Sequence, residues 1–136
     1  MGIIMSRTHI PAIELKGPYK CLANSYPTSV IVEGITYPSV EHAFLAAKVL
    51  DRTVKFKISK MSDLAEVRKL LSDEWTRPNW NEVRYATLHQ LVKIKFESNK
   101  DLAKVLTNTG TKRIGGKRDS ELGSILMKVR GEILRA

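Results

Sequence analysis

The stretch from Trp80 to Phe96 constrains the fold of this chain more than any other part of its sequence. Its apolar residues recur at intervals of three and four, which is the period of a helix with one buried stripe. A helix of about five turns carrying such a stripe predicts the central helix of the protein. The residues expected to be buried along it are Trp80, Val83, Thr87, Leu88, Leu91, Val92 and Ile94.

The remaining patterns predict an α+β protein that is rich in helix and has one short β-hairpin. Two β-prone runs, 30–32 and 35–37, flank Glu33 and Gly34, and Gly34 can adopt the positive φ that a tight turn needs. Residues 1–18 show no helical period and are expected to form an irregular or edge segment. Helices are expected near residues 39–50, 53–60, 63–72, 80–97, 99–107 and 120–134, with Ser39, Ser62, Asn79 and Asn99 as N-cap residues. The last helix is expected to bury Leu122, Ile125, Leu126, Val129 and Ile133 and to expose Lys128, Arg130 and Glu132.

The size and composition of the chain predict one domain over residues 1–136. An apolar content of 43% suits a globular protein with one core. The apolar runs are far shorter than the roughly 18 residues of a membrane span, and the start lacks a signal-peptide core, so we expect a cytoplasmic protein without a membrane partner. Cys21 is the only cysteine, and His9, His42 and His89 show no metal-ligand spacing. We therefore predict neither a metal nor a cofactor.

The charge of the chain favours anionic partners. Twenty-three Lys and Arg residues against fourteen Asp and Glu residues give a net charge of +9, which suits nucleotides, polynucleotides or anionic surfaces. The cationic residues cluster within 55–60, at Lys93 and Lys95, and within 112–118. For the first two clusters, a solvated surface is an equally good interpretation.

A polar helix start follows the expected hairpin, with the sequence Tyr37-Pro38-Ser39-Val40-Glu41-His42-Ala43-Phe44. Ser39 is a good N-cap, so the helix is expected to begin at Val40, with Glu41 in its first turn. At about 100° per residue, one face carries Glu41, Leu45 and Lys48, and another carries Val40, Ala43, Phe44 and Ala47. One face can therefore pack against the core while the other offers chemistry.

This helix start, with Lys48 and several other runs, resembles the NADAR (YbiA-like) family. The resemblance covers about residues 19–130 and includes the run 22–27, the hairpin-like run 30–37, Trp80 with Val83, Lys95-Phe96 followed by Asn99, Leu106 with Thr109-Gly110, and the runs 122–123 and 126–130. It implies a helix-rich fold and an activity on nucleotides, because characterised members cleave N-glycosidic bonds in ADP-ribose-like or riboflavin-precursor nucleotides.

The chain departs from the family pattern between Thr109 and Gly123. The family's Asp-x-x-Trp-Gly segment has no counterpart here, and Ser120 stands where an asparagine is expected. A surface loop of about a dozen residues is absent, within the variation that such loops tolerate.

The resemblance implies that Glu41 is the catalytic carboxylate. A fixed carboxylate can stabilise the charge that develops on a ribosyl group during cleavage, or activate the attacking water. From the sequence alone, a first-turn glutamate that complements the helix dipole is the better interpretation, and the resemblance reverses that preference. Without the missing segment, the candidates for a second acidic group are Asp119 and Glu121.

Eight residues are candidates for ligand binding. Lys48 suits a phosphate or ribose contact, and His42 is expected to support Glu41 through structural hydrogen bonds. Trp80 could stack on a base or serve as a packing anchor. The loop 109–118 is rich in glycine and positive charge, which suits a diphosphate cradle or a plain flexible connection. The full set is Asn24, Tyr26, His42, Lys48, Trp80, Gly110, Arg113 and Lys117.

The resemblance implies an N-glycosidase that acts on an ADP-ribosyl or related nucleotide-like substrate. Two alternatives stay open. One is a catalytically impaired relative that binds or sequesters an ADP-ribose-type ligand, and the other is a nucleic-acid-binding protein that acts on ADP-ribosylated nucleic acid.

Overall fold

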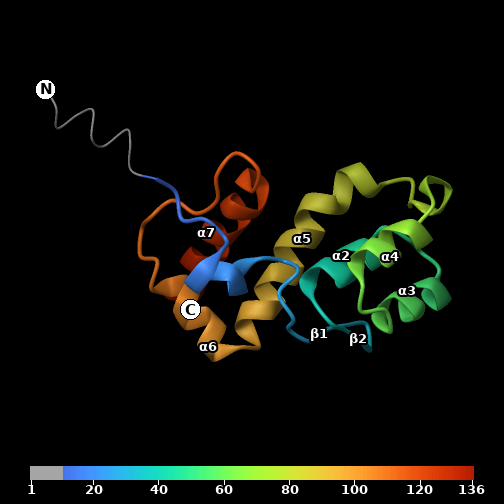
Figure 1. Ribbon diagram of the computed structural model, residues 1–136, viewed down its shortest axis with the longest axis horizontal. Coiled ribbons are helices and arrows are strands. Elements are labelled where there is room, and N and C mark those ends of the chain that lie inside the picture. Colours follow the sequence, from blue (N-terminus) through green and yellow to red (C-terminus); the bar gives the residue numbers. More distant parts are fainter. Residues whose placement is uncertain (1–10) are drawn as a thin grey trace, which may run out of the picture.

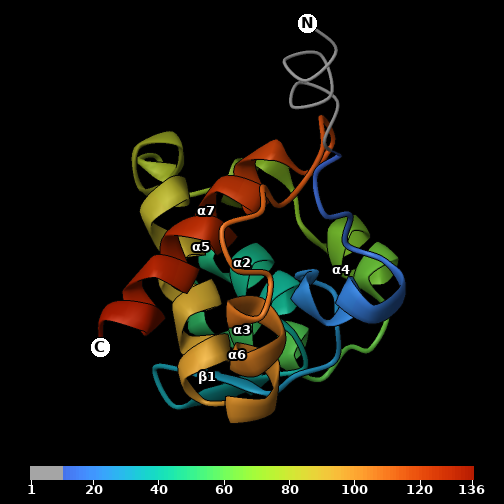
Figure 2. The same cartoon turned by 90° about the vertical axis from the view of Figure 1, so that its left-hand side faces the viewer.

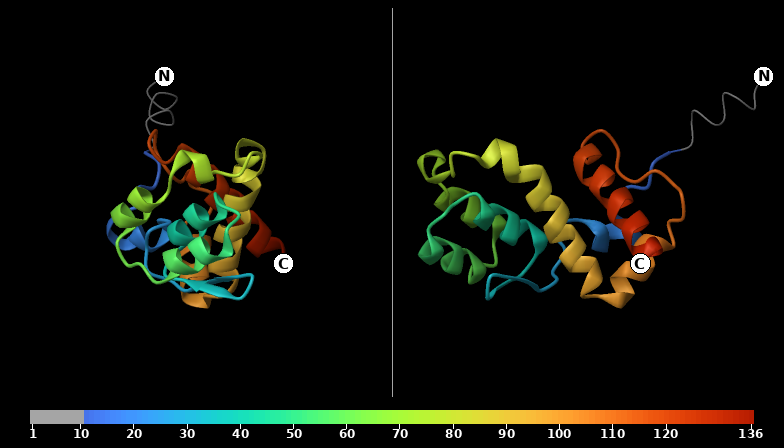
Figure 3. Two further views of the ribbon diagram at one scale, coloured as in Figure 1. Left: turned by 90° about the vertical axis from the view of Figure 1, so that its right-hand side faces the viewer. Right: turned by 180° about the vertical axis from the view of Figure 1, so that it is seen from behind.

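The structure is a computed structural model that describes residues 11–136. Its longest helix, α5 (Trp80–Glu97), packs against α2 (Val40–Ala47) on one side and α7 (Ser120–Arg135) on the other. Figures 1 and 3 show α5 running between the group formed by α2, α3 and α4 and the group formed by α6 and α7. The helix expected from the apolar stripe is therefore present, with the predicted bounds.

The fold is helix-rich with one two-stranded antiparallel hairpin, as the sequence predicts. All the predicted helices form, and their predicted ends lie within three residues of the observed ones. The remaining elements are η1 (Gly17–Leu22), β1 (Val30–Val32), β2 (Ile35–Tyr37), α3 (Arg52–Ser59), α4 (Leu64–Leu70), η2 (Asp73–Trp75) and α6 (Lys100–Thr107).

The hairpin forms because its turn accepts positive φ at two consecutive residues. Glu33 has a φ of 49° and Gly34 a φ of 81°, the combination that matches the twist of a tight antiparallel hairpin. Val30 then pairs with Tyr37. Both side chains are buried, so the hairpin packs one face on the core beside α2 and leaves Ile31 exposed.

Side-chain caps fix where the short helices begin. The Ser39 hydroxyl accepts a hydrogen bond from the His42 N–H at 3.1 Å, which places Glu41 in the first turn of α2 as predicted. The predicted N-cap of α4 was wrong by one residue, because Asp63 rather than Ser62 accepts from the Ala65 N–H. Asn79 and Asn99 precede α5 and α6, but neither side chain makes a capping hydrogen bond.

Two side chains expected at the surface are buried. Lys95, interpreted as part of a basic surface cluster, is 1% exposed, and Arg130, expected in solvent, is 8% exposed. Arg130 donates to the Thr109 hydroxyl and to the Lys112 carbonyl, both at 2.8 Å. These cations are used inside the protein to hold main-chain turns.

The N-terminal segment crosses the loop before α7. Of the residues 1–18 expected to lack a helix, residues 1–10 fall outside the described residues, and the 3₁₀ helix η1 begins at Gly17, where the expected segment ends. Ile13 makes an isolated parallel bridge with Ile114, in which the Ile13 N–H donates to the Arg113 carbonyl and the Gly115 N–H to the Ile13 carbonyl. Figure 2 shows this blue segment beside the orange loop. Within residues 11–136, no helix combines the length and the apolar content needed to cross a membrane.

Candidate active site

A pocket of about 400 Å³ lies where α2, α5, the start of α7 and the turn after η1 meet. All three acidic residues that the sequence analysis named line it, although Glu41 lies about 80 positions from Asp119 and Glu121 in the sequence. The lining residues are Leu15, Ala23, Asn24, Ser25, Glu41, Phe44, Leu88, Arg118, Asp119, Glu121 and Leu122.

Glu41 reaches this pocket from the first turn of α2. Its N–H donates to the Asn24 carbonyl at 3.0 Å, which ties the helix start to the turn that forms another wall. Its Oε2 lies 3.3 Å from Nη2 of Arg68, and its side chain is 24% exposed. A single long contact to a half-exposed arginine stabilises the carboxylate only weakly, so Glu41 is accessible to a ligand.

Glu121 is engaged by a neighbouring arginine. Its two carboxylate oxygens accept from Nη1 and Nη2 of Arg84 at 2.8 and 2.9 Å. These hydrogen bonds, opposed by burial, lower the pKa of Glu121, and the guanidinium of Arg84 also lies 5.8 Å from the centroid of the Phe44 ring. Glu121 is therefore held ionised and fixed to α5, which makes it a poor proton donor.

Asp119 is the second carboxylate that suits chemistry. It is half-buried and precedes α7, where its main-chain carbonyl accepts from the Gly123 N–H at 2.6 Å. Within residues 11–136 its carboxylate takes part in neither a hydrogen bond nor an ion pair. Glu41 and Asp119 thus approach one pocket from different walls.

His42 and Trp80 do not line this pocket. His42 is 3% exposed, its Nδ1 lies 2.7 Å from the Ser39 hydroxyl, and burial lowers its pKa, opposed by the main chain of Met61. Trp80 is 8% exposed, and its ring centroid lies 5.1 Å from that of Phe44. The packing-anchor interpretation of Trp80 therefore describes its place in the fold, and the stacking interpretation does not.

Lys48 lies next to the pocket but in a different hollow. It caps the C-terminal end of α2 and lines a space of about 280 Å³ together with Arg68. Arg68 joins this space to Glu41, because its guanidinium contacts the Glu41 carboxylate. The expected division of α2 into a packing face and a chemical face was wrong for Leu45, which is buried because α3, α4 and α5 all contact this helix.

Two residues of the turn after η1, Asn24 and Tyr26, were predicted to bind a ligand, and only Asn24 lines the pocket. The Tyr26 ring packs against the core instead, with its centroid 5.8 Å from the Lys95 ammonium. Asn24 therefore has direct access to a bound ligand, whereas Tyr26 belongs to the support behind the wall.

Only part of the loop before α7, residues 109–118, borders the site. Lys117 lines a neighbouring hollow of about 380 Å³, which shares Leu15, Arg118 and Asp119 with the carboxylate pocket. Gly110 has a φ of 65° and is exposed, and Arg113 uses its carbonyl to hold Ile13. Neither lines the carboxylate pocket or this neighbouring hollow, so only the end of the basic loop borders the site.

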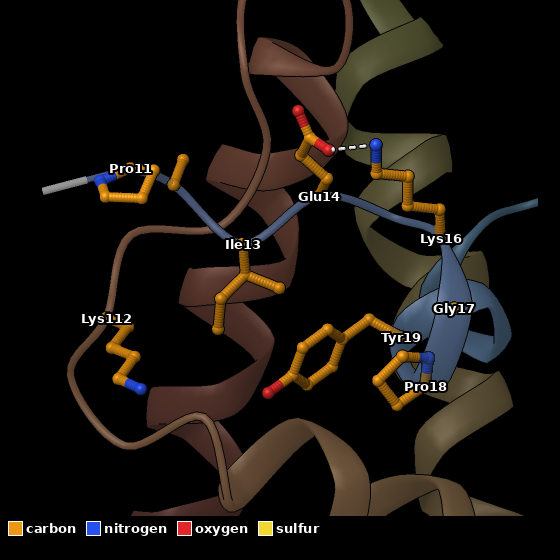
Figure 4. A pocket seen from close by; sticks show the side chains of 9 residues that line it. Pro11, Ile13, Glu14, Lys16, Gly17, Pro18, Tyr19 and Lys112 are labelled. Carbon is orange, nitrogen blue, oxygen red and sulfur yellow. Dashed lines mark ion pairs between the residues drawn. The ribbon is translucent and has the colours of Figure 1, made fainter.

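A further hollow of about 780 Å³ lies along the N-terminal segment. Figure 4 shows Ile13, Tyr19 and Lys112 around it, with the ion pair between Glu14 and Lys16 drawn as a dashed line at 2.7 Å. None of the three predicted carboxylates lines it. Within residues 11–136, no group of three or more His, Cys, Asp or Glu side chains is arranged to hold a metal ion.

Sequence reasoning missed two of the arginines near the carboxylates. Arg68 and Arg84 make their contacts with Glu41 and Glu121 across 27 and 37 residues, whereas Arg118, which lines the pocket, belongs to the basic loop that the sequence analysis named. No local pattern in the sequence marks such partners. Lys95 did carry a signal, since it lies within a run that resembles the family, but its burial was not expected.

Comparisons with known proteins agree with this architecture. A family model described as the NADAR domain matches residues 13–119. The chain is 33% identical over 128 residues to a riboflavin biosynthesis protein of Vibrio vulnificus (strain YJ016), which covers 82% of this chain but only 35% of that protein. It is 25% identical over 146 residues to the N-glycosidase YbiA of Escherichia coli (strain K12), covering 96% of this chain and 91% of that one.

The fold is also similar to a solved one. The NMR structure of the E. coli protein YbiA superposes with a TM-score of 0.79 at 23% identity, covering 93% of this chain and 89% of that chain. The family model covers most of the described residues, including both Glu41 and Asp119. The chain therefore belongs to the NADAR family.

Proposed function

We propose that this protein hydrolyses the N-glycosidic bond of a nucleotide-like substrate, of the ADP-ribosyl or a related kind, in the pocket lined by Glu41 and Asp119. The observation that carries the proposal is that these two carboxylates, 78 positions apart in sequence, line one pocket in a family whose relatives include proteins named N-glycosidase.

The chemistry follows from the charge that develops during cleavage. Breaking the bond between the anomeric carbon and the base nitrogen leaves positive charge on the ribosyl group, which a nearby carboxylate stabilises. The departing nitrogen takes up one proton from solvent. Water adds to the anomeric carbon and passes one proton to Glu41, which returns it to solvent, so that the net reaction consumes one water and regenerates the carboxylate. Asp119, on a different wall, is the group available to hold the departing base.

The cations around the pocket suit the phosphates of such a substrate. Arg118 lines the carboxylate pocket, and Lys117 lines the adjoining hollow. Both side chains are exposed, and within residues 11–136 neither is paired with an acid. Unpaired cations beside a pocket attract an anionic ligand and can contact its phosphate oxygens.

Replacement of Glu41 by glutamine tests the proposal, because it keeps the shape of the side chain and removes its charge. We expect Glu41→Gln to lower kcat by about a hundredfold or more with little change in the affinity for ADP-ribose. Product release would be followed by chromatography and mass spectrometry on an ADP-ribosylated nucleoside, the same group on an oligonucleotide, and a ribosylated pyrimidine. Glu66→Gln, which alters an exposed carboxylate paired with Lys69, is the matched control.

The second candidate function is ligand binding without turnover, and the arginine contacts favour it. Arg84 holds both carboxylate oxygens of Glu121, and Arg68 makes one longer contact with Glu41, so the first carboxylate is largely neutralised and the second only weakly. A wild-type protein whose melting temperature rises with ADP-ribose, but which releases no product from any of the three substrates, would support this second function and overturn the first.

A further inference from the structure

Lys95 is a buried cation that the proposed reaction does not use. It lies on α5, is 1% exposed, and its Nζ donates to the Ala23 carbonyl at 2.8 Å. The same ammonium lies 5.8 Å from the centroid of the Tyr26 ring and 5.3 Å from that of Phe96. Its polar partner therefore belongs to the turn that follows η1.

Stability does not account for an ammonium in this position. Removing a charged amine from water is unfavourable unless its interactions in the interior repay the cost, and burial accordingly lowers the pKa of Lys95 to about 8, opposed by Cys21. A methionine would fill a similar volume without that cost. The hydrogen bond of the ammonium to the Ala23 carbonyl, rather than a gain in stability, therefore accounts for its position.

What the ammonium holds is one wall of the pocket. The Ala23 carbonyl also accepts from the Tyr26 N–H at 3.2 Å, which closes the turn Ala23–Tyr26. The two central residues of this turn, Asn24 and Ser25, line the pocket. This turn is also bonded to α2, the helix that carries Glu41, because the Asn24 carbonyl accepts a hydrogen bond from the Glu41 N–H at 3.0 Å.

We propose that Lys95 is a positioning residue of this site, whose ammonium clamps the Ala23–Tyr26 turn and thereby fixes Asn24 and the main chain of Glu41. Its kinetic consequence rests on the proposed glycosidase function, whereas the clamp itself does not. A hydrogen bond to a charged donor is stronger than a neutral one, so the clamp holds the turn more firmly than its Tyr26 N–H bond alone.

The test compares Lys95→Met with Lys93→Met in the full chain. Lys93 lies on the same helix but borders a different hollow, with Glu132 and Lys100, so it serves as the matched control. We expect Lys95→Met to fold with an equal or higher melting temperature. Its Glu41 amide should exchange with solvent about tenfold faster than in the wild type, and kcat should fall about tenfold, more than the affinity for ADP-ribose. Lys93→Met should match the wild type in each measurement.

The outcomes separate the clamp from the reaction. Exchange at Glu41 that is unchanged in Lys95→Met would overturn the proposal, and so would loss of cooperative folding, since the ammonium would then be needed for the fold itself. Faster exchange together with a wild-type kcat would show that the turn position is irrelevant to turnover and would also overturn it. If the wild-type protein proves inactive, the proposed function fails, while the exchange measurement still decides whether Lys95 fixes Glu41.

Discussion

The contact between α7 and the loop before it gives the sharpest test of this structure, because it leaves no room for a side chain at Gly123. A Cβ atom built at Gly123 overlaps the Ile114 carbonyl oxygen and lies 3.1 Å from the Cα of Gly115. Both neighbours are main-chain atoms, which cannot rotate away as the end of a side chain can. Gly123→Ala must therefore displace the loop from the helix.

The size of the effect follows from two opposing contributions. Alanine is favoured over glycine in a helix by up to about 1 kcal/mol. Against this, overpacking of a tight contact typically costs about 1–3 kcal/mol. Displacement of the loop at Ile114 also weakens the 2.8 Å hydrogen bonds that Ile13 makes with its neighbours Arg113 and Gly115, worth about 1 kcal/mol each. We expect the free energy of unfolding to fall by about 2 kcal/mol, which lowers the melting temperature by about 7 °C in a chain of this length.

Differential scanning calorimetry measures this difference, and Gly131→Ala provides the control within the same helix. A Cβ atom at Gly131 meets only the end of the Arg135 side chain, which can move, with the nearest atom at 3.1 Å. Gly131→Ala should therefore raise the melting temperature by a few degrees. The reasoning would be refuted if Gly123→Ala were as stable as Gly131→Ala, because the loop would then not pack against α7 as described.

Three further predictions concern the charged groups. Asp119→Asn should lower kcat by about a hundredfold or more in steady-state kinetics, whereas Glu121→Gln should lower kcat by about tenfold or less. Glu121→Gln should also lower the free energy of unfolding by about 1 kcal/mol, because Arg84 loses its ion pair. A larger loss of kcat in Glu121→Gln than in Asp119→Asn would contradict the assignment of Asp119 as the second carboxylate. Raising the pH from 8 to 10.5 should increase the free energy of unfolding contributed by Lys95 by up to about 3 kcal/mol. Its pKa falls from 10.5 to about 8 on folding, so the unfolded chain binds more protons in this interval and the cost of burial is fully present only below pH 8. Urea denaturation of the wild type and Lys95→Met measures it, and parallel pH profiles for the two proteins would disprove the shift. Arg130→Met should lower the free energy of unfolding by about 1–3 kcal/mol, because the Lys112 carbonyl and the Thr109 hydroxyl lose a charged donor, and an unchanged denaturation midpoint would argue against that role.

Local chemistry determined the secondary structure of this protein, and the sequence therefore predicted it well. The apolar stripe from Trp80 to Phe96 gives the bounds of α5, and Ser39 caps α2 where expected, because periodicity and capping act within a few residues. The positive φ of Gly34 forms the hairpin for the same reason. The run around Glu41 resembles the NADAR family, to which the family model assigns residues 13–119, and this resemblance implied the role of that carboxylate from sequence.

The tertiary structure alone decided which charged groups are buried and which carboxylates are engaged. Lys95 meets the Ala23 carbonyl across 72 residues, and Arg84 meets Glu121 across 37, so no local pattern could reveal either contact. Three neighbouring helices contact α2, which buries Leu45 although its position in the helix pattern placed it beside Glu41. The sequence fixes which side chains are available to the pocket, whereas the free energy of each charge depends on the partners and the solvent that packing brings to it, and these exist only in the assembled fold.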